Sequence, residues 1–214
     1  MTTVARGPYR AGIEKRRRIV EKAIAVFGEH GYGGGSLRMV AERVGASASQ
    51  IIALFGSKDG LLTAVLNEWD ARQVDDGRFT GIAHIEALRA RMRYSREHPE
   101  YVEFFATLCA EATALSHPAH QYFIDRYERV ADALEQHLRL AAETGEIAPL
   151  ADPLYREEAR ALSAMMDGLQ LQWLMNRRFD MVAAFDRFLD AAIARWQAPA
   201  SPAPGRHDET GKER

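Results

Sequence analysis

Apolar residues recur at helical spacing along most of this chain of 214 residues, and this periodicity is the feature that most constrains its fold. No proline lies between Pro8 and Pro99, and Pro99, Pro118 and Pro153 each open an apolar-periodic stretch, as expected where a missing N–H costs nothing. No series of alternating strands occurs, so the sequence predicts an all-α fold. The periodicity predicts nine helices, near residues 13–30, 37–44, 48–54, 58–75, 82–97, 99–115, 118–144, 153–178 and 181–196.

Charge is distributed unevenly along the chain. Residues 1–60 carry 10 Lys and Arg against 5 Asp and Glu, whereas residues 61–214 carry 18 against 25. A basic N-terminal part on an acidic remainder indicates that one end contacts a polyanion. Chance clustering around the basic run at residues 15–18 is the alternative explanation.

Several classes of protein are excluded by what the sequence lacks. It has no run of about 18 apolar residues, so we expect no contact with a membrane. The N-terminus has no apolar signal core, and the single cysteine, Cys109, can form neither an internal disulfide nor a cysteine-based zinc site. His117 and His120 have no third metal ligand nearby, and the motifs of common hydrolases and nucleotide-binding loops do not occur. We therefore expect a cytoplasmic protein with no metal, no cofactor and no catalytic residues.

The sharpest local pattern lies in the stretch LRMVAERVGASASQIIALFG. Ser36 can cap its first helix, Gly45 permits a left-handed turn, and Ser47 can cap the second helix. A small residue at Ala41, a glycine four positions later and an apolar residue at Ile51 suit two helices that cross steeply. These are the packing requirements of a DNA-binding helix-turn-helix, although any tight corner between two helices meets some of them.

The residues around this pattern resemble the tetracycline-repressor (TetR) family of bacterial regulators, over about residues 13–66. The positions that carry the resemblance are Phe27, Gly31, Tyr32, Ser36, Ala41, Gly45, Ser47, Phe55, Ser57, Lys58, Leu61 and Leu62. The DGLQLQW stretch at 167–173 is similar to the C-terminal half of the choline–betaine regulators. The resemblance implies an N-terminal domain that binds DNA and a C-terminal helical domain that dimerises and binds a small molecule.

The second helix of the motif departs from the family where a tyrosine usually touches phosphate, because this chain has Ile52 there, followed by Ala53. The apolar pair can meet thymine methyls or simply pack. Gln50 can pair with adenine, and Ser49 can donate to a base or a phosphate. The serines can equally act as helix caps, and Arg38 can be a solvated charge. The expected DNA-binding residues are Ser36, Arg38, Ser47, Ala48, Ser49, Gln50, Ile52 and Lys58.

Aromatic and methionine side chains recur at helical spacing in the C-terminal half. Packing in the hydrophobic core is the simpler explanation for each of them, whereas the resemblance implies a ligand pocket among these helices. The candidate ligand-binding residues are Tyr101, Phe104, Phe105, Tyr127, Met165, Leu169 and Trp173. An apolar lining of this kind predicts a hydrophobic or aromatic effector.

The helix expected at 153–178 carries a second stripe, in which small residues lie four apart. Such a stripe lets the same helix of a second copy approach closely, although burial against the same chain is the alternative. The candidate dimer-interface residues are Ala164, Gly168, Leu171, Met175, Phe185 and Phe188.

Together these patterns predict a homodimeric repressor that binds a near-palindromic operator in double-stranded DNA and is released by a small-molecule effector. The expected divisions are a flexible basic lead at 1–12, a DNA-binding domain at 13–57, a ligand-binding and dimerisation domain at 58–196, and a disordered tail at 197–214. Two alternatives remain at this point: a DNA-binding protein with no effector, and an all-helical enzyme whose basic end is incidental.

Overall fold

The computed structural model describes residues 8–72 and 78–198, and this part of the chain is built from nine helices and no strands. The helices are α1 (Pro8–Gly34), α2 (Leu37–Val44), α3 (Ala48–Phe55), α4 (Lys58–Arg72), α5 (Gly81–Glu97), α6 (Pro99–Glu111), α7 (His120–Glu143), α8 (Asp152–Met175) and α9 (Met181–Gln197). The all-α prediction is confirmed.

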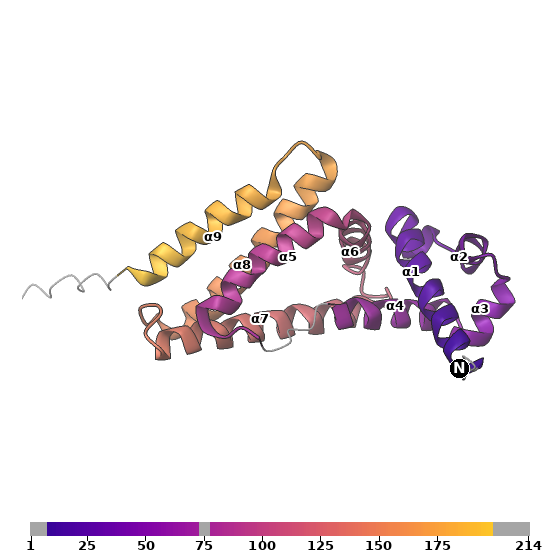
Figure 1. Ribbon diagram of the computed structural model, residues 1–214, viewed down its shortest axis with the longest axis horizontal. Coiled ribbons are helices and arrows are strands. Elements are labelled where there is room, and N and C mark those ends of the chain that lie inside the picture. Colours follow the sequence, from indigo (N-terminus) through magenta and orange to yellow (C-terminus); the bar gives the residue numbers. More distant parts are fainter. Residues whose placement is uncertain (1–7, 73–77, 199–214) are drawn as a thin grey trace, which may run out of the picture.

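Helices α1, α2 and α3 form a head at one end of an elongated molecule, while α5, α7, α8 and α9 form a helical bundle (Figure 1). Helix α4 runs from the head toward the bundle, and α6 lies between the two. None of the described helices is long and apolar enough to cross a membrane.

Two predicted boundaries were wrong. The first helix begins at Pro8 rather than at residue 13, and it is interrupted at Gly31, which takes a positive φ of 68°. Helix α6 ends at Glu111, and Pro118 does not begin a helix, because residues 112–119 form a series of turns. Polar contacts local to these turns hold them, since the Ala119 N–H donates to the His117 ring and a His120 ring nitrogen lies 2.7 Å from the Ala112 carbonyl oxygen.

The buried side chains form two clusters. The first joins α1 to α4 with α6 and the start of α7, and it holds Phe27, Ile51, Leu61 and Phe104. The second joins α5, α7, α8 and α9 with Val102 of α6. Helix α6 therefore contributes side chains to both clusters, which places it between the head and the bundle.

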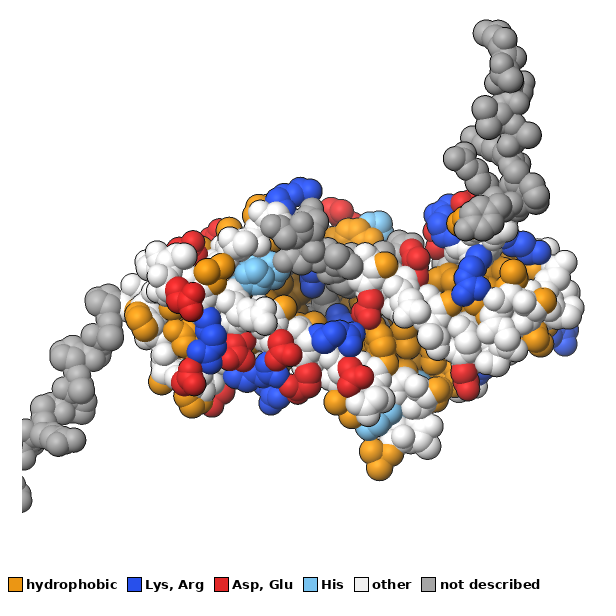
Figure 2. All heavy atoms as spheres, turned by 90° about the horizontal axis from the view of Figure 1, so that it is seen from below, with side chains coloured by type: hydrophobic (Ala, Val, Ile, Leu, Met, Phe, Trp, Pro, Cys, Tyr) orange, Lys and Arg blue, Asp and Glu red, His pale blue; other side chains and the backbone are white. Residues whose placement is uncertain are grey.

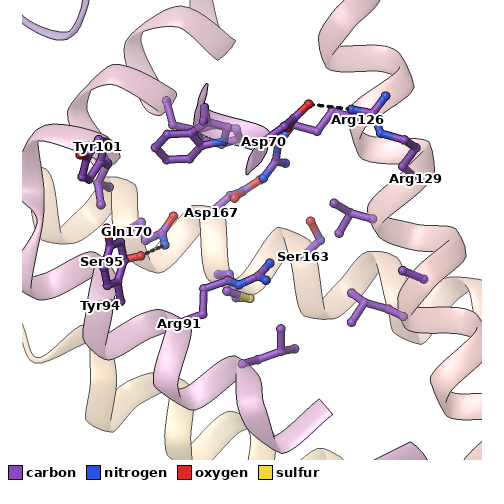
Figure 3. Close-up of a pocket in the computed structure, with 18 of the residues that line it drawn as sticks. Asp70, Arg91, Tyr94, Ser95, Tyr101, Arg126, Arg129, Ser163, Asp167 and Gln170 are labelled. Atoms are coloured by element: carbon purple, nitrogen blue, oxygen red, sulfur yellow. Dashed lines mark hydrogen bonds and ion pairs between the residues drawn. The ribbon is translucent and has the colours of Figure 1, made fainter. Parts of the chain in front are cut away.

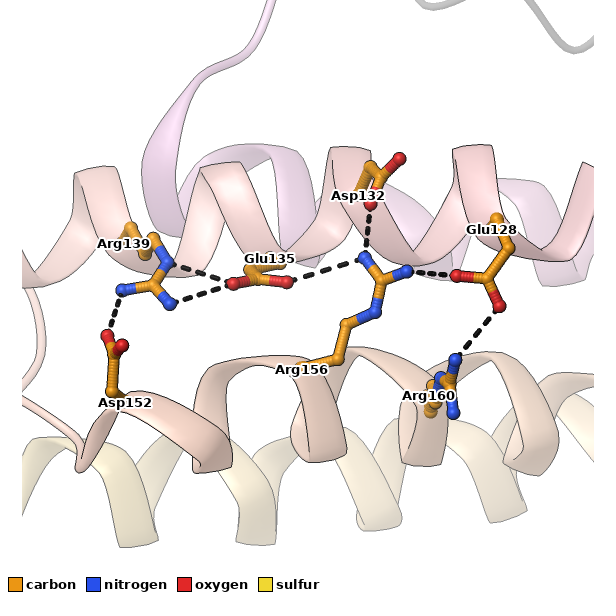
Figure 4. A network of polar contacts seen from close by, with 7 residues as sticks. All are labelled: Glu128, Asp132, Glu135, Arg139, Asp152, Arg156 and Arg160. Carbon is orange, nitrogen blue, oxygen red and sulfur yellow. Dashed lines mark hydrogen bonds and ion pairs between the residues drawn. The ribbon is translucent and has the colours of Figure 1, made fainter.

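A network of ion pairs joins α7 to α8 on the surface (Figure 4). The Arg156 guanidinium contacts Glu128, Asp132 and Glu135, and Arg139 bridges Glu135 and Asp152 at 2.8 and 2.7 Å. Networks of this kind stabilise more than isolated surface pairs, because one ordered guanidinium serves several carboxylates.

We predict that Arg156→Met lowers the melting temperature by a few degrees at low salt, because three carboxylates then face one another without their shared cation. The difference should shrink at about 1 M salt, where the Debye length is about 3 Å. Thermal unfolding followed by circular dichroism measures it. Arg178→Met is the matched control, since Arg178 is exposed and forms no ion pair with the described residues. Equal melting temperatures for the two variants at low salt would contradict the prediction.

Candidate DNA-reading surface and ligand cavity

Helix α2 is fixed at both ends by its own sequence. The Ser36 hydroxyl accepts a hydrogen bond from the Met39 N–H at 3.2 Å, which satisfies one of the free donors of the first turn. Gly45 takes a left-handed conformation with φ 67°, and the Ala46 N–H then bonds to the Ala41 carbonyl at 2.9 Å. The chain therefore reverses sharply after α2, as a helix-turn-helix requires.

A capping box starts α3. The Gln50 N–H donates to the Ser47 hydroxyl at 3.3 Å, while the Gln50 side-chain oxygen accepts from the Ser47 N–H at 3.4 Å. Ile51 and Phe55 are buried against the head. These contacts fix which side of the short helix faces outward.

The outward face of α3 carries both polar and apolar side chains. Ser49, Gln50 and Ala53 are exposed, and Ile52 exposes 47% of its surface. Ser47 and Ser49 share a hydrogen bond of 2.9 Å between their hydroxyls. The Gln50 oxygen that would accept from adenine is committed to the capping box, so pairing with a base requires the long bond to Ser47 to break.

Lys and Arg side chains are scattered over the head on the side seen in Figure 2. Arg16 donates to the Leu54 carbonyl at 2.7 Å and lies over the Phe55 ring, so it braces the C-terminal end of α3. The sequence had marked residues 15–18 only as a basic run, and Arg16 was missed as a residue that positions α3.

Two predicted DNA contacts already have partners within the chain. Arg38 is highly exposed but pairs with Glu42 at 3.1 Å, one helical turn away. The Lys58 ammonium lies 4.3 Å from the centroid of the Tyr32 ring, at the beginning of α4. Both cations remain on the surface side of the head, and Ala48 lies partly buried at the first turn of α3.

A cavity of about 370 Å³ lies among α4, α5, α6, α7 and α8 (Figure 3). Its apolar wall includes Trp69, Leu88, Tyr101, Val102, Phe105, Val130, Leu134 and Met166. Its polar wall includes Asp70, His84, Arg91, Ser95, Arg126, Arg129, Ser163, Asp167 and Gln170. The volume falls near the lower end of the range of about 300–1,000 Å³ that is usual for small-molecule sites.

The cavity contains only part of the predicted ligand set. Tyr101 and Phe105 line it, whereas Phe104, Met165, Leu169 and Trp173 do not. Phe104 is buried on the side of α6 that faces α1. The remaining predicted residue, Tyr127, lies just behind the wall and donates from its hydroxyl to Asp167 at 2.8 Å.

The α8 residues that line the cavity are Ser163, Met166, Asp167 and Gln170, and of these Met166 and Gln170 lie one position after the predicted Met165 and Leu169. The polar residues of α5 and α7 were missed altogether. Their spacing was a usable signal, because Leu88, Arg91 and Ser95 follow one another at helical intervals.

Burial governs the titration of the groups behind this wall. Burial raises the pKa of Asp167, while the hydrogen bond from Tyr127 opposes that shift. Burial also raises the pKa of the Cys109 thiol, which lies 3.4 Å from the Tyr127 hydroxyl. Cys109 is therefore held as an unreactive thiol.

The stripe of α8 that was assigned to dimerisation is uncovered in a single chain. Ala164 is exposed, Leu171 and Met175 expose 46% and 79% of their surfaces, and no atom lies within 4 Å of the position of a Cβ on Gly168. The assignment of Phe185 needs correction, because its side chain is fully buried in the second cluster of the same chain. Phe188, one turn later on α9, is only partly buried.

Among the described residues, no three His, Cys, Asp or Glu side chains gather in a way that could hold a metal ion. The His117 ring faces Glu111 at 3.9 Å, and burial lowers the pKa of His117.

Comparison with known proteins agrees with this architecture. Residues 19–65 match the family model of bacterial regulatory proteins of the tetR family, and residues 85–194 match the C-terminal model of BetI-type transcriptional repressors. The chain is 28% identical to the transcriptional regulatory protein RaaS of Mycobacterium tuberculosis, over 77% of this chain and 73% of that protein. It is 33% identical to the transcriptional repressor AcnR of Corynebacterium diphtheriae, over 44% of this chain and 46% of that protein.

The fold is also similar to that of a transcriptional regulator from Saccharomonospora viridis solved in complex with choline, with a TM-score of 0.67 and 24% identity over 85% of this chain and 96% of that one. The related families and proteins are transcriptional regulators and not enzymes. The chain therefore belongs to the TetR family of bacterial transcriptional regulators.

Proposed function

We propose that this regulator is a homodimeric repressor that binds a near-palindromic operator through α3 and leaves it when a small molecule occupies the cavity. The observation that carries the proposal is the position of α6, which lines the cavity with one face and packs against α1 of the head with another. The proposed DNA-binding domain is residues 13–57, and residues 58–196 form the proposed ligand-binding and dimerisation domain.

The proposed DNA surface is the exposed face of α3 with the helix starts beside it. Free N–H groups at the first turns of α2, α3 and α4 favour phosphate, and Arg38 and Lys58 lie at two of these starts. Ile52 and Ala53 offer methyl groups to thymine in the major groove. Ser49 and Gln50 supply hydrogen-bonding groups for base edges.

The proposed dimer pairs α8 and α9 with their copies around a two-fold axis. The exposed residues Ala164, Leu171 and Met175 and the partly buried Gly168 would lie at its centre, with Phe188 beside them. Small residues allow two helices to approach closely, and four helices then form the interface. In such a dimer, the two copies of α3 must lie about 34–36 Å apart to enter successive major-groove turns.

Contacts of α6 with α1 supply the proposed route from cavity to DNA. A Cβ atom on Gly28 would lie 3.1 Å from the Phe104 backbone nitrogen, so a larger residue there would require the two backbones to move apart by a few tenths of an ångström. The Thr107 hydroxyl donates to the Gly28 carbonyl at 3.1 Å. At the end of α6, the Glu111 carboxylate accepts from the N–H groups of Tyr32 and Gly33 at 2.6 and 3.3 Å.

Helix α4 offers a second route, since it begins at Lys58 beside α3 and reaches the cavity at Trp69 and Asp70. A ligand that prefers a spacing of the heads unsuited to DNA shifts the population away from the bound form. A coupling of about 1–3 kcal/mol corresponds to a loss of operator affinity of about 5- to 150-fold.

The experiment that tests the function is footprinting on the DNA beside the gene of this protein, followed by operator titration with each metabolite that raises its melting temperature. We expect protection of two half-sites and loss of protection with at least one such metabolite. Protection that no stabilising metabolite alters would identify a DNA-binding protein without an effector.

Gln50→Ala and Lys58→Ala form a matched pair for the DNA surface. Lys58→Ala should weaken binding to all sequences and flatten the salt dependence by about one unit, because one phosphate contact is lost. Gln50→Ala should instead relax the preference at one base pair in each half-site, at a cost of about 1–3 kcal/mol. Gel-shift titrations at two salt concentrations, with operators substituted at each position, separate these results. An unchanged base preference in Gln50→Ala would remove that residue from base readout.

Gly168→Leu tests the dimer. A Cβ added at Gly168 lies in open space beside its own helix, and leucine favours a helix more than glycine does by up to about 1 kcal/mol. The monomer should therefore remain folded while dimerisation and operator affinity fall. Sedimentation should give twice 24.0 kDa for the natural chain and a lower mass for the variant. Ala83→Leu, at an exposed position of α5, is the control. A Gly168→Leu variant that stays fully dimeric contradicts this interface.

Glu111→Gln tests the route through α6. The amide keeps one acceptor oxygen but loses the charge, so one of the two N–H contacts to the head weakens by about 1–2 kcal/mol. We expect effector affinity to stay unchanged while the effector lowers operator affinity by a smaller factor. Calorimetry and operator titration measure the two quantities. An unchanged coupling factor would show that the route does not pass through Glu111.

A further inference from the structure

We propose that the cavity binds an organic anion with an apolar body, namely an aryl carboxylate, and that Arg126 holds its carboxylate group. This inference deepens the proposed function, because it rests on the cavity being the effector site. It follows from which charged side chains of the cavity already have partners and which do not.

The two acidic side chains of the cavity already have donors. Asp70 accepts from the Tyr122 hydroxyl at 2.8 Å and from the Arg129 guanidinium at 3.3 Å. Asp167 accepts from the Tyr127 hydroxyl at 2.8 Å. Burial raises the pKa of Asp167, whereas the Tyr127 hydrogen bond and the charge of Arg126 lower it. Neither carboxylate is therefore open to attract a cationic ligand.

One basic side chain of the cavity, that of Arg126, has no such partner within the described part of the chain. Arg126 lies with its guanidinium carbon 4.7 Å from the centroid of the Phe105 ring, and it forms no ion pair with any carboxylate of the described residues. Arg91 on α5 and Arg129 on α7 also line the cavity, and Arg129 is the cation that pairs with Asp70 (Figure 3). A guanidinium presents parallel N–H groups that match a carboxylate in a bidentate pair.

An apolar surface lies directly beside this charge. Phe105, which Arg126 covers, stacks on Trp69 with centroids 5.6 Å apart and an angle of 15° between the rings. Tyr101 and Met166 extend the apolar wall. An aromatic ring that carries its carboxylate on a short arm can thus pack on this wall while its charge meets Arg126.

This charge distribution makes the cavity unsuited to a quaternary ammonium ligand such as choline. Aromatic side chains alone would suit a quaternary ammonium group through cation–π contacts. Here, however, a guanidinium already occupies the face of Phe105, and a second cation placed there would be repelled.

The test is calorimetric titration of the full chain with four probes of similar size: phenylacetate, phenylacetamide, phenethylamine and choline. We expect phenylacetate to bind at least about tenfold more tightly than its amide at low salt, which is about 1.4 kcal/mol. The advantage should diminish with added salt. Phenethylamine and choline should bind more weakly than the amide.

Arg126→Gln should remove about 10- to 100-fold of the phenylacetate affinity, as expected for a hydrogen-bonded ion pair, and should leave the amide nearly unaffected. Arg160→Gln is the matched control, because Arg160 is exposed and pairs with Glu128 outside the cavity. Arg126→Lys, which keeps the charge without the planar fork, should give an intermediate affinity. If Arg126→Gln fails to fold, the four-probe series with the natural chain still decides the matter.

The inference is overturned if the amide binds as tightly as the acid, if phenethylamine or choline binds best, or if no aryl carboxylate binds at millimolar concentration. Its failure is distinguishable from that of the proposed function. A neutral ligand that fills the cavity and releases operator DNA overturns the anion class alone. A carboxylate that binds through Arg126 without changing operator affinity supports the anion site and overturns its role as the effector site.

Discussion

The close contact between α1 and α6 is the constraint on which the arrangement of head and bundle depends. The backbone of Phe104 packs tightly on Gly28, where an added Cβ would lie only 3.1 Å from it, and Thr107 and Glu111 add hydrogen bonds between the same two helices. These contacts satisfy the backbone N–H groups left free where α1 is interrupted at Gly31. Without them, the head would be joined to the bundle chiefly through α4.

The helices of the head could be predicted from the sequence because interactions between residues close together in the chain determine where they begin and end. Capping by Ser36 and Ser47 and the left-handed turn at Gly45 each depend on residues within a few positions. The capping box could also be recognised locally, yet its consequence for Gln50 was missed, because one side chain serves both the helix start and the proposed base contact. Arg16 was missed for another reason: its partner, the Leu54 carbonyl, lies 38 positions away.

The cavity was less predictable because it depends on the rotation of five helices about their axes. Aromatic residues are a poor guide to such a site, because Phe104 and Trp173 are buried in the core whereas Phe105 lines the cavity. A shift of one position along α8 puts Gln170 at the cavity in place of Leu169, so that a polar side chain lies where an apolar one was predicted. The apolar part of the wall could be predicted, whereas Arg91, Arg126 and Arg129 come to line one cavity only in three dimensions.

The same packing explains how occupancy of the cavity can reach the DNA surface. Phe105 and Trp69 stack on each other at the cavity wall, and both belong to the cluster that also holds Phe27 and Ile51 of the head. Protein interiors are close-packed, so a ligand that displaces these rings must move their neighbours rather than compress them. The ion pairs between α7 and α8 hold the far wall of the cavity together. In the proposed switch, displacement would therefore be directed toward α4, which begins at the head, and α6, which packs against it.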